Sequence, residues 1–152
     1  MSNEVSNKLD HITFAVSNVE GVIEAYGKVL PDFVLWDQGI VTRRPGVKLA
    51  MLSSKSGPRI EFLEPAGGIE TRFSAFLEAH GEGAFGLCFF CEEYDLEMKR
   101  LRENNIVFEE ESQEDLFPGY PFRVAWVPPG QLHTGVWIEL VDSKALPPFE
   151  KG

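Results

Sequence analysis

Three ionisable residues stand inside otherwise apolar segments of the sequence, at His11, Glu61 and Glu139. One imidazole and two carboxylates suit a divalent metal such as Mn²⁺, Co²⁺, Ni²⁺ or Zn²⁺. The same set can also move protons without a metal. The simpler alternative is that His11 hydrogen-bonds locally while both glutamates face water at the ends of strands.

The segments around these residues belong to an internal repeat. The aligned pairs are all predicted strands: residues 11–16 with 86–91, residues 47–52 with 122–127, and residues 59–64 with 137–142. The first strand of each half leads into a predicted helix. Each half is therefore expected to follow the order strand, helix, strand, strand, strand, which predicts two tandem βαβββ modules and an α+β fold.

Three helices are predicted from apolar spacing and end signals. The first covers residues 17–30, where Ser17 and Glu20 have capping-box spacing. The second covers residues 92–105 and stops at two asparagines, and a linker helix over residues 69–80 ends at Gly81.

Strand alternation predicts which face carries the ionisable residues. His11 shares a face with Thr13, opposite the apolar face of Ile12, Phe14 and Val16. Glu61 and Glu139 likewise oppose apolar neighbours on their strands. All three are thus expected on the sheet face away from the helices, as a polar cluster in a cleft.

Composition excludes several classes of function. The chain has 152 residues, 43% hydrophobic residues and a net charge of −10, which indicates one globular domain and argues against nucleic acid or an anionic membrane as partner. The first residues do not resemble a signal peptide, and no apolar run is long enough for a membrane span. Cys88 and Cys91 fit buried strand thiols better than a redox pair, and a cytoplasmic location is expected.

The chain resembles the vicinal oxygen chelate superfamily, in particular its glyoxalase, bleomycin-resistance and methylmalonyl-CoA epimerase-like branch. The resemblance rests on four segments: residues 9–16, 60–65, 76–83 and 135–141. It implies a curled mixed sheet around a central cleft, with module one at 9–65, a linker helix at 66–83 and module two at 84–142. Residues 1–8 and 143–152 are expected to be tails.

The resemblance also implies a metal site. Position by position, the ligands carried over are His11, Glu61 and Glu139. The family's fourth ligand, usually histidine, falls on Gly86, which has no side chain. Water or substrate can fill that position, His133 or His80 can reach in, or the site can be a pocket without metal.

A second departure concerns Arg44, which stands about where epimerase-like members carry an acidic residue. A guanidinium stays protonated and cannot act as a base, which argues against methylmalonyl-CoA epimerisation as such. Arg43 and Arg44 are instead expected to hold a carboxylate or phosphate, with an exposed basic hairpin as the alternative.

Two functions are therefore expected. The first is a lyase or isomerase acting on a small carbonyl compound or a CoA or thiol conjugate, with Glu139 as the preferred base and Glu61 as the second carboxylate. The second is a metal-free protein that binds or sequesters a small hydrophobic or anionic molecule. The expected ligand contacts are Arg43, Arg44, Phe85, Trp126 and His133, with Trp36 and Trp137 as further apolar candidates. Family analogy adds a homodimer as an expectation.

Overall fold

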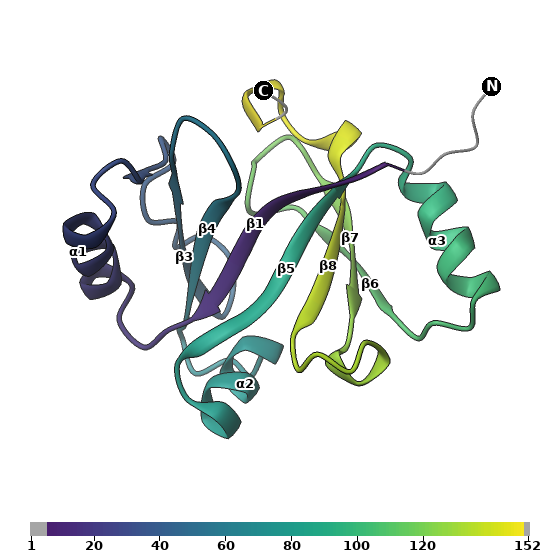
Figure 1. Ribbon diagram of the computed structural model, residues 1–152, viewed down its shortest axis with the longest axis horizontal. Helices are drawn as coiled ribbons and strands as arrows, with labels where there is room; N and C mark the ends of the chain where they lie inside the picture. Colours follow the sequence, from purple (N-terminus) through teal and green to yellow (C-terminus); the bar gives the residue numbers. More distant parts are fainter. Residues whose placement is uncertain (1–5, 151–152) are drawn as a thin grey trace. The chain divides into compact units, whose positions relative to one another are not determined.

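The strands and helices follow the predicted βαβββ order twice (Figure 1). The computed structural model describes residues 6–150. The first run contains β1 (Asn7–Ala15), α1 (Val19–Val29), β2 (Val34–Leu35), β3 (Val47–Ser53) and β4 (Arg59–Pro65). The second contains β5 (Gly83–Cys91), α3 (Tyr94–Glu103), β6 (Glu109–Gln113), β7 (Phe122–Val127) and β8 (Trp137–Asp142). Helix α2 (Arg72–His80) joins the two runs, and the short 3₁₀ turns are η1 (Pro129–Gln131), η2 (Ser143–Ala145) and η3 (Pro148–Glu150).

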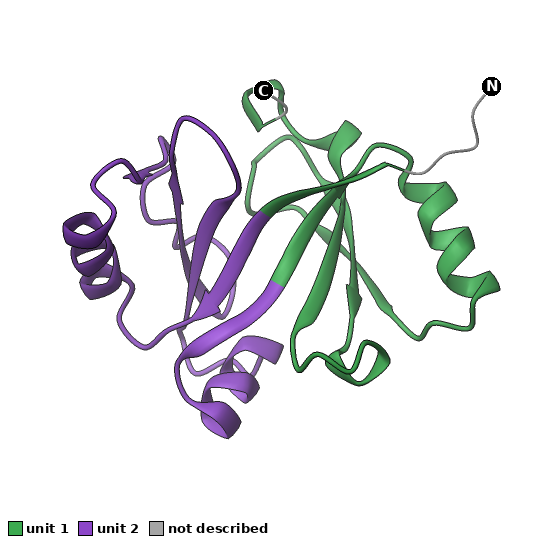
Figure 2. Ribbon diagram, viewed as in Figure 1, with its two compact units in different colours: residues 1–10, 87–152 green, residues 11–86 purple. Residues whose placement is uncertain are grey.

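The sheet is mixed, which confirms the predicted α+β class. Its strand order is β2-β3-β4-β1-β5-β8-β7-β6. Strands β1 and β4 run parallel, whereas β2, β3 and β4, and likewise β6, β7 and β8, pair antiparallel. Figure 2 shows two compact units: unit 2 is residues 11–86, and unit 1 is residues 1–10 with 87–152. The predicted central cleft remains a prediction.

The core of unit 2 lies between α1 and one face of its strands. Val19 of α1 is fully buried among Val16, Ala50, Leu52 and Phe62. The rings of Tyr26 and Phe62 meet edge to face at 4.8 Å between centroids. Because Phe14 and Ile60 also pack on this cluster, the predicted helix-facing side of the strands is confirmed.

The start of α1 differs from the prediction by one residue. Asn18 is the N-cap, and its side-chain oxygen accepts a hydrogen bond from the Gly21 backbone N–H at 3.1 Å. Ser17, predicted to cap the helix, instead donates from its backbone N–H and its hydroxyl to Glu82. The Ser17 capping box is therefore wrong, since asparagine is an equally strong cap one residue later.

The core of unit 1 repeats the arrangement with α3. Tyr94 and Met98 are buried against Cys91, Ala125 and Leu140. Burial raises the pKa of the Cys91 thiol to about 12, and the charge of Glu97 adds to the rise. Strand alternation places Cys88 on the opposite face of β5 from Cys91. This geometry agrees with two buried strand thiols and not with a redox pair.

Helix α2 confirms a helix in the predicted linker and its end at Gly81, although it begins at Arg72 and not at Ile69. It begins with a capping box between Thr71 and Ser74, and it ends at Gly81, whose φ of 76° favours glycine. Phe73 and Phe76 place their rings 4.9 and 5.4 Å from that of Phe85 on β5.

The predicted tails are only partly described. Strand β1 starts at Asn7, and residues 1–5 and 151–152 lie outside the described residues. Leu146 and Pro147, which fall in the predicted C-terminal tail, are buried. Within residues 6–150, no helix is long and apolar enough to cross a membrane.

Candidate functional site

His11 and Glu61 form a buried pair in unit 2. Nε2 of His11 lies 3.4 Å from Oε1 of Glu61, and both side chains are more than nine-tenths buried. The parallel pairing of β1 with β4 creates this proximity, because it sets Thr13 directly opposite Glu61 and His11 opposite Arg59. His11 therefore reaches Glu61 diagonally across two neighbouring strands. As predicted from strand alternation, the two side chains lie on the same face of the sheet.

Thr13 and Arg44 complete the surroundings of the Glu61 carboxylate. Thr13 Oγ1 donates a hydrogen bond to Glu61 Oε1 at 3.0 Å. Burial alone would raise the pKa of Glu61, but the His11 imidazole, the Arg44 guanidinium and the Thr13 hydroxyl together hold the pKa below its ordinary value. Glu61 is thus held as a carboxylate in a buried position with polar and charged neighbours.

The pair has donor chemistry and spacing that fit a divalent metal. Two ligand atoms at about 2.1 Å from a tetrahedral ion are about 3.4 Å apart, and about 3.0 Å apart in an octahedral site. The separation of 3.4 Å between His11 Nε2 and Glu61 Oε1 lies in this range. Imidazole and carboxylate are common ligands for such ions, and Thr13 would orient the Glu61 carboxylate as an outer-shell partner. The same distance also fits a direct ion pair without metal.

Glu139 lies on β8 in unit 1, directly opposite Trp126 on β7. Both side chains are buried, and paired residues of antiparallel strands share a face. The indole Nε1 of Trp126 donates to Glu111 Oε1 at 2.7 Å, and Gln113 Nε2 donates to the same oxygen at 3.2 Å. This face of unit 1 therefore carries the carboxylates of Glu139 and Glu111 together with the Gln113 amide and the Trp126 indole.

Cys88 is close to Glu139 on the same unit. Its Sγ lies within 4.8 Å of a carboxylate oxygen of Glu139, and both side chains are buried. In the internal repeat, residues 88 and 139 align with Thr13 and Glu61. In each βαβββ run, a side chain of the first strand therefore lies near the glutamate carboxylate of the last strand.

The other predicted contact residues have different environments. Arg44 is half-buried, whereas Arg43 is exposed and donates to Gln38 at 3.4 Å. His133 is exposed, with a φ of 57° just after η1. Phe85 is fully buried beneath α2. The roles of these residues in ligand binding remain predictions.

Three residues of this environment had no assigned role in the sequence analysis: Thr13, Glu111 and Gln113. Thr13 was detectable, because alternation places it beside His11 on the same face. Glu111 stands in a run of three glutamates, a pattern typical of a solvated strand end. Its bond to Trp126 depends on the pairing of β6 with β7, which no local pattern reveals.

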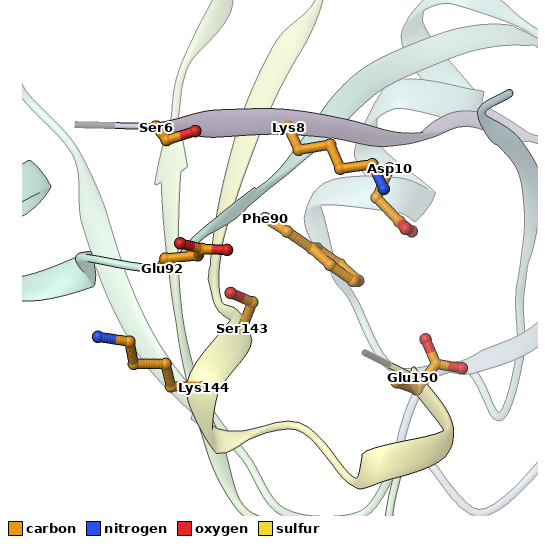
Figure 3. A pocket seen from close by; sticks show the side chains of 8 residues that line it. All are labelled: Ser6, Lys8, Asp10, Phe90, Glu92, Ser143, Lys144 and Glu150. Carbon is orange, nitrogen blue, oxygen red and sulfur yellow. The ribbon is translucent and has the colours of Figure 1, made fainter. Parts of the chain in front are cut away.

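A separate pocket of about 520 Å³ lies in unit 1. Figure 3 shows the Phe90 ring projecting into it, with Lys8 and Asp10 of β1 on one side and Ser143 on another. Its remaining lining residues are Ser6, Glu92, Lys144 and Glu150. Phe90, which lines this pocket, is two residues after Cys88 on β5, so the two side chains lie on the same face of the strand.

Fold and site together define a class of protein. The family model of the glyoxalase/bleomycin resistance protein/dioxygenase superfamily matches residues 10–124. The chain therefore belongs to this superfamily, which confirms the resemblance to vicinal oxygen chelate proteins. No curated protein matches the sequence at a significant level.

Several solved structures are similar to this chain in sequence and fold. Methylmalonyl-CoA epimerase from Mycobacterium tuberculosis is 25% identical with a TM-score of 0.72, over 88% of this chain and 86% of that one. A hypothetical protein from Bacillus halodurans C-125 is 28% identical with a TM-score of 0.73, over 90% and 94%. A variant of Streptomyces coelicolor methylmalonyl-CoA epimerase in complex with 2-nitronate-propionyl-CoA is 23% identical with a TM-score of 0.69, over 91% and 97%. This last likeness shows the fold.

Proposed function

We propose that this chain is an isomerase that moves a proton on the carbon next to a carbonyl group in a small thioester or related carbonyl compound. The observation that carries the proposal is the buried His11–Glu61 pair at 3.4 Å, at two ligand positions implied by the superfamily. The likeness to an epimerase at 25% identity supports the reaction class.

In this proposal His11, Glu61 and Glu139 hold a divalent metal. When bound, such an ion supplies Lewis-acid polarisation of the substrate carbonyl. Glu61 and Glu139 occupy equivalent positions in the two modules, which supports including both in one ligand set. Their joint participation rests on the repeat and the superfamily, not on a distance.

Glu139 is the proposed base that takes the proton. Glu61 is poorly suited to this role, since His11, Arg44 and Thr13 hold its pKa below the ordinary value and so weaken it as a base. Glu61 is therefore better suited to remaining a carboxylate throughout. Glu139 is then the carboxylate of the proposed ligand set that is left for proton transfer.

Arg44 is the proposed anchor for a negatively charged group of the substrate. It is half-buried and near enough to Glu61 for its charge to act on that carboxylate. Arginine binds carboxylates and phosphates through paired N–H groups. The substrate is thus expected to carry an acid group in addition to the reacting carbonyl, with Trp126, Phe85, His133 and Arg43 as secondary contacts.

Exchange of the substrate's α-proton with D₂O, followed by proton NMR on a panel of acyl-CoA thioesters that includes methylmalonyl-CoA, tests this function. Wild-type protein should exchange the α-proton of at least one thioester, and Glu139→Gln should lower that rate by about 10²- to 10⁴-fold. Glu103→Gln, which alters an exposed carboxylate on α3, is the matched control. Wild-type exchange rates in Glu139→Gln would contradict the role of Glu139 as the base, and no exchange with any thioester would contradict a thioester substrate.

A second candidate function is metal-free binding of a small anionic or hydrophobic molecule. It is favoured by the fact that Glu61 already has His11, Thr13 and Arg44 as partners. A carboxylate matched in this way requires no cation for stability. This candidate predicts ligand binding by calorimetry with no proton exchange and no bound metal. A homodimer is a further expectation that light scattering can test.

A further inference from the structure

Cys88 and Glu139 repeat, with a different donor atom, the arrangement of Thr13 and Glu61. In unit 2, the Thr13 hydroxyl donates to Glu61 at 3.0 Å. In unit 1, Cys88 Sγ lies within 4.8 Å of a Glu139 carboxylate oxygen. The aligned positions are the same, so the second module places sulfur where the first module has a hydroxyl.

The position of Cys88 on β5 relates it to the ligand that this chain lacks. Gly86 occupies the family's ligand position and offers no side chain. Residues 86 and 88 share a face of β5, about 6.7 Å apart along the strand. Cys88 is therefore the next side chain after Gly86 on that face, and it is fully buried beside Glu139.

We propose that Cys88 is the donor that β5 contributes to the metal site, as a thiolate next to Glu139, in place of the side chain missing at Gly86. The inference rests on the proposed function, because it requires that Glu139 be a ligand. A zinc ion takes sulfur at about 2.3 Å and carboxylate oxygen at about 2.0–2.2 Å, which puts the two donors about 3.6 Å apart in a tetrahedral site. The limit of 4.8 Å between Cys88 and Glu139 contains this spacing.

A sulfur ligand changes which metal the site prefers. Thiolates select zinc and other soft or borderline ions, whereas oxygen-rich sites suit Mn²⁺ and Mg²⁺. The cation class assigned to this chain is therefore Zn²⁺ or Co²⁺ in preference to Mn²⁺. Coordination releases the thiol proton to solvent, so each metal bound by Cys88 frees one proton from that residue.

Cobalt spectroscopy tests the assignment directly. Protein loaded with Co²⁺ should show visible d–d bands together with the near-ultraviolet charge-transfer band of a thiolate on cobalt. Cys88→Ser should abolish the charge-transfer band and weaken Co²⁺ binding by about 10- to 100-fold or more, since even outer-shell partners have effects of that size. Cys91→Ala is the matched control and should retain the band, because Cys91 packs on the α3 face. Cys88→Thr, which installs the residue found at the aligned position, provides a second variant if the serine variant folds poorly.

The outcomes separate this inference from the proposed function. Cobalt d–d bands without a charge-transfer band in wild-type protein, or a band that survives in both Cys88 variants, would overturn the role of Cys88 and leave the metal site intact. No Co²⁺ binding at all in wild-type protein would overturn both the metal site and the cysteine ligand. Proton release on Zn²⁺ binding gives an independent measurement, which should fall by about one proton per metal in Cys88→Ser.

Discussion

The imidazole of His11 and the carboxylate of Glu61 lie 3.4 Å apart, on adjacent parallel strands and away from solvent. The two residues are 50 positions apart in the sequence. The parallel pairing of β1 with β4 brings them together. A charged pair buried in an apolar core is costly unless each member has a partner. The pair meets this condition, since each residue has the other as a polar partner.

Glu61→Gln should reduce the change in protein stability with pH in the acidic range. The folded-state pKa of Glu61 lies below its ordinary value, so ionised Glu61 stabilises the protein above the ordinary pKa and loses this effect as pH falls through the folded-state pKa. At pH 7 the substitution should lower the free energy of unfolding by about 1–3 kcal/mol. Urea unfolding between pH 3 and pH 7 measures both effects.

Glu78→Gln is the control for this experiment, since Glu78 is exposed on α2. It should leave the pH profile of stability unchanged. A wild-type profile in Glu61→Gln would show that Glu61 is not held ionised by its neighbours.

Thr13→Val should destabilise the protein although it preserves the shape of the side chain. It removes the hydroxyl that donates to Glu61 Oε1 at 3.0 Å in a buried environment. Hydrogen bonds to charged groups are worth about 1.5–3 kcal/mol, and denaturant unfolding should show a loss of that size. Thr13→Ser keeps the hydroxyl and should retain most of the stability; equal losses in both variants would attribute the effect to packing instead.

Arg44→Met should raise the pKa of Glu61. The positive charge of Arg44 is one of the influences that hold this pKa down, and methionine removes the charge while keeping a long side chain. Carbon-13 NMR of the glutamate carboxyl groups can follow the titration. Arg43→Met is the matched control, because Arg43 is exposed and donates to Gln38. An unchanged Glu61 titration in Arg44→Met would contradict the assigned influence of Arg44.

Asn18→Ala should destabilise α1 more than Ser17→Ala does. Asn18 accepts the Gly21 N–H as the N-cap, and loss of such a cap costs about 1 kcal/mol. Ser17 contacts Glu82 at an exposed site, where hydrogen bonds contribute less. Thermal unfolding of both variants compares the two positions, and the reverse order would restore Ser17 as the cap.

Alternation predicted the two faces of the site strands because each strand has one apolar side. Phe14 and Ile60 face α1, and His11 and Glu61 face away from it, as expected. The sequence did not reveal which polar neighbour donates a hydrogen bond to Glu61. The register that sets Thr13 opposite Glu61 joins segments that are far apart in the chain. The contact of Glu111 with Trp126 is hidden from the sequence for the same reason, since Trp126 lies on another strand. Local patterns therefore predicted the elements and their faces, whereas strand pairing determined the contacts.

Metal titration of the wild-type protein and of His11→Ala tests the central claim most directly. Calorimetry with Mn²⁺, Co²⁺, Ni²⁺ and Zn²⁺, on protein first treated with a chelator, should show one ion bound per chain in the wild type. His11→Ala should lose that binding while His80→Ala, which changes an exposed histidine on α2, retains it. Absence of binding by the wild-type protein for all four ions, or unchanged binding by His11→Ala, would contradict the account.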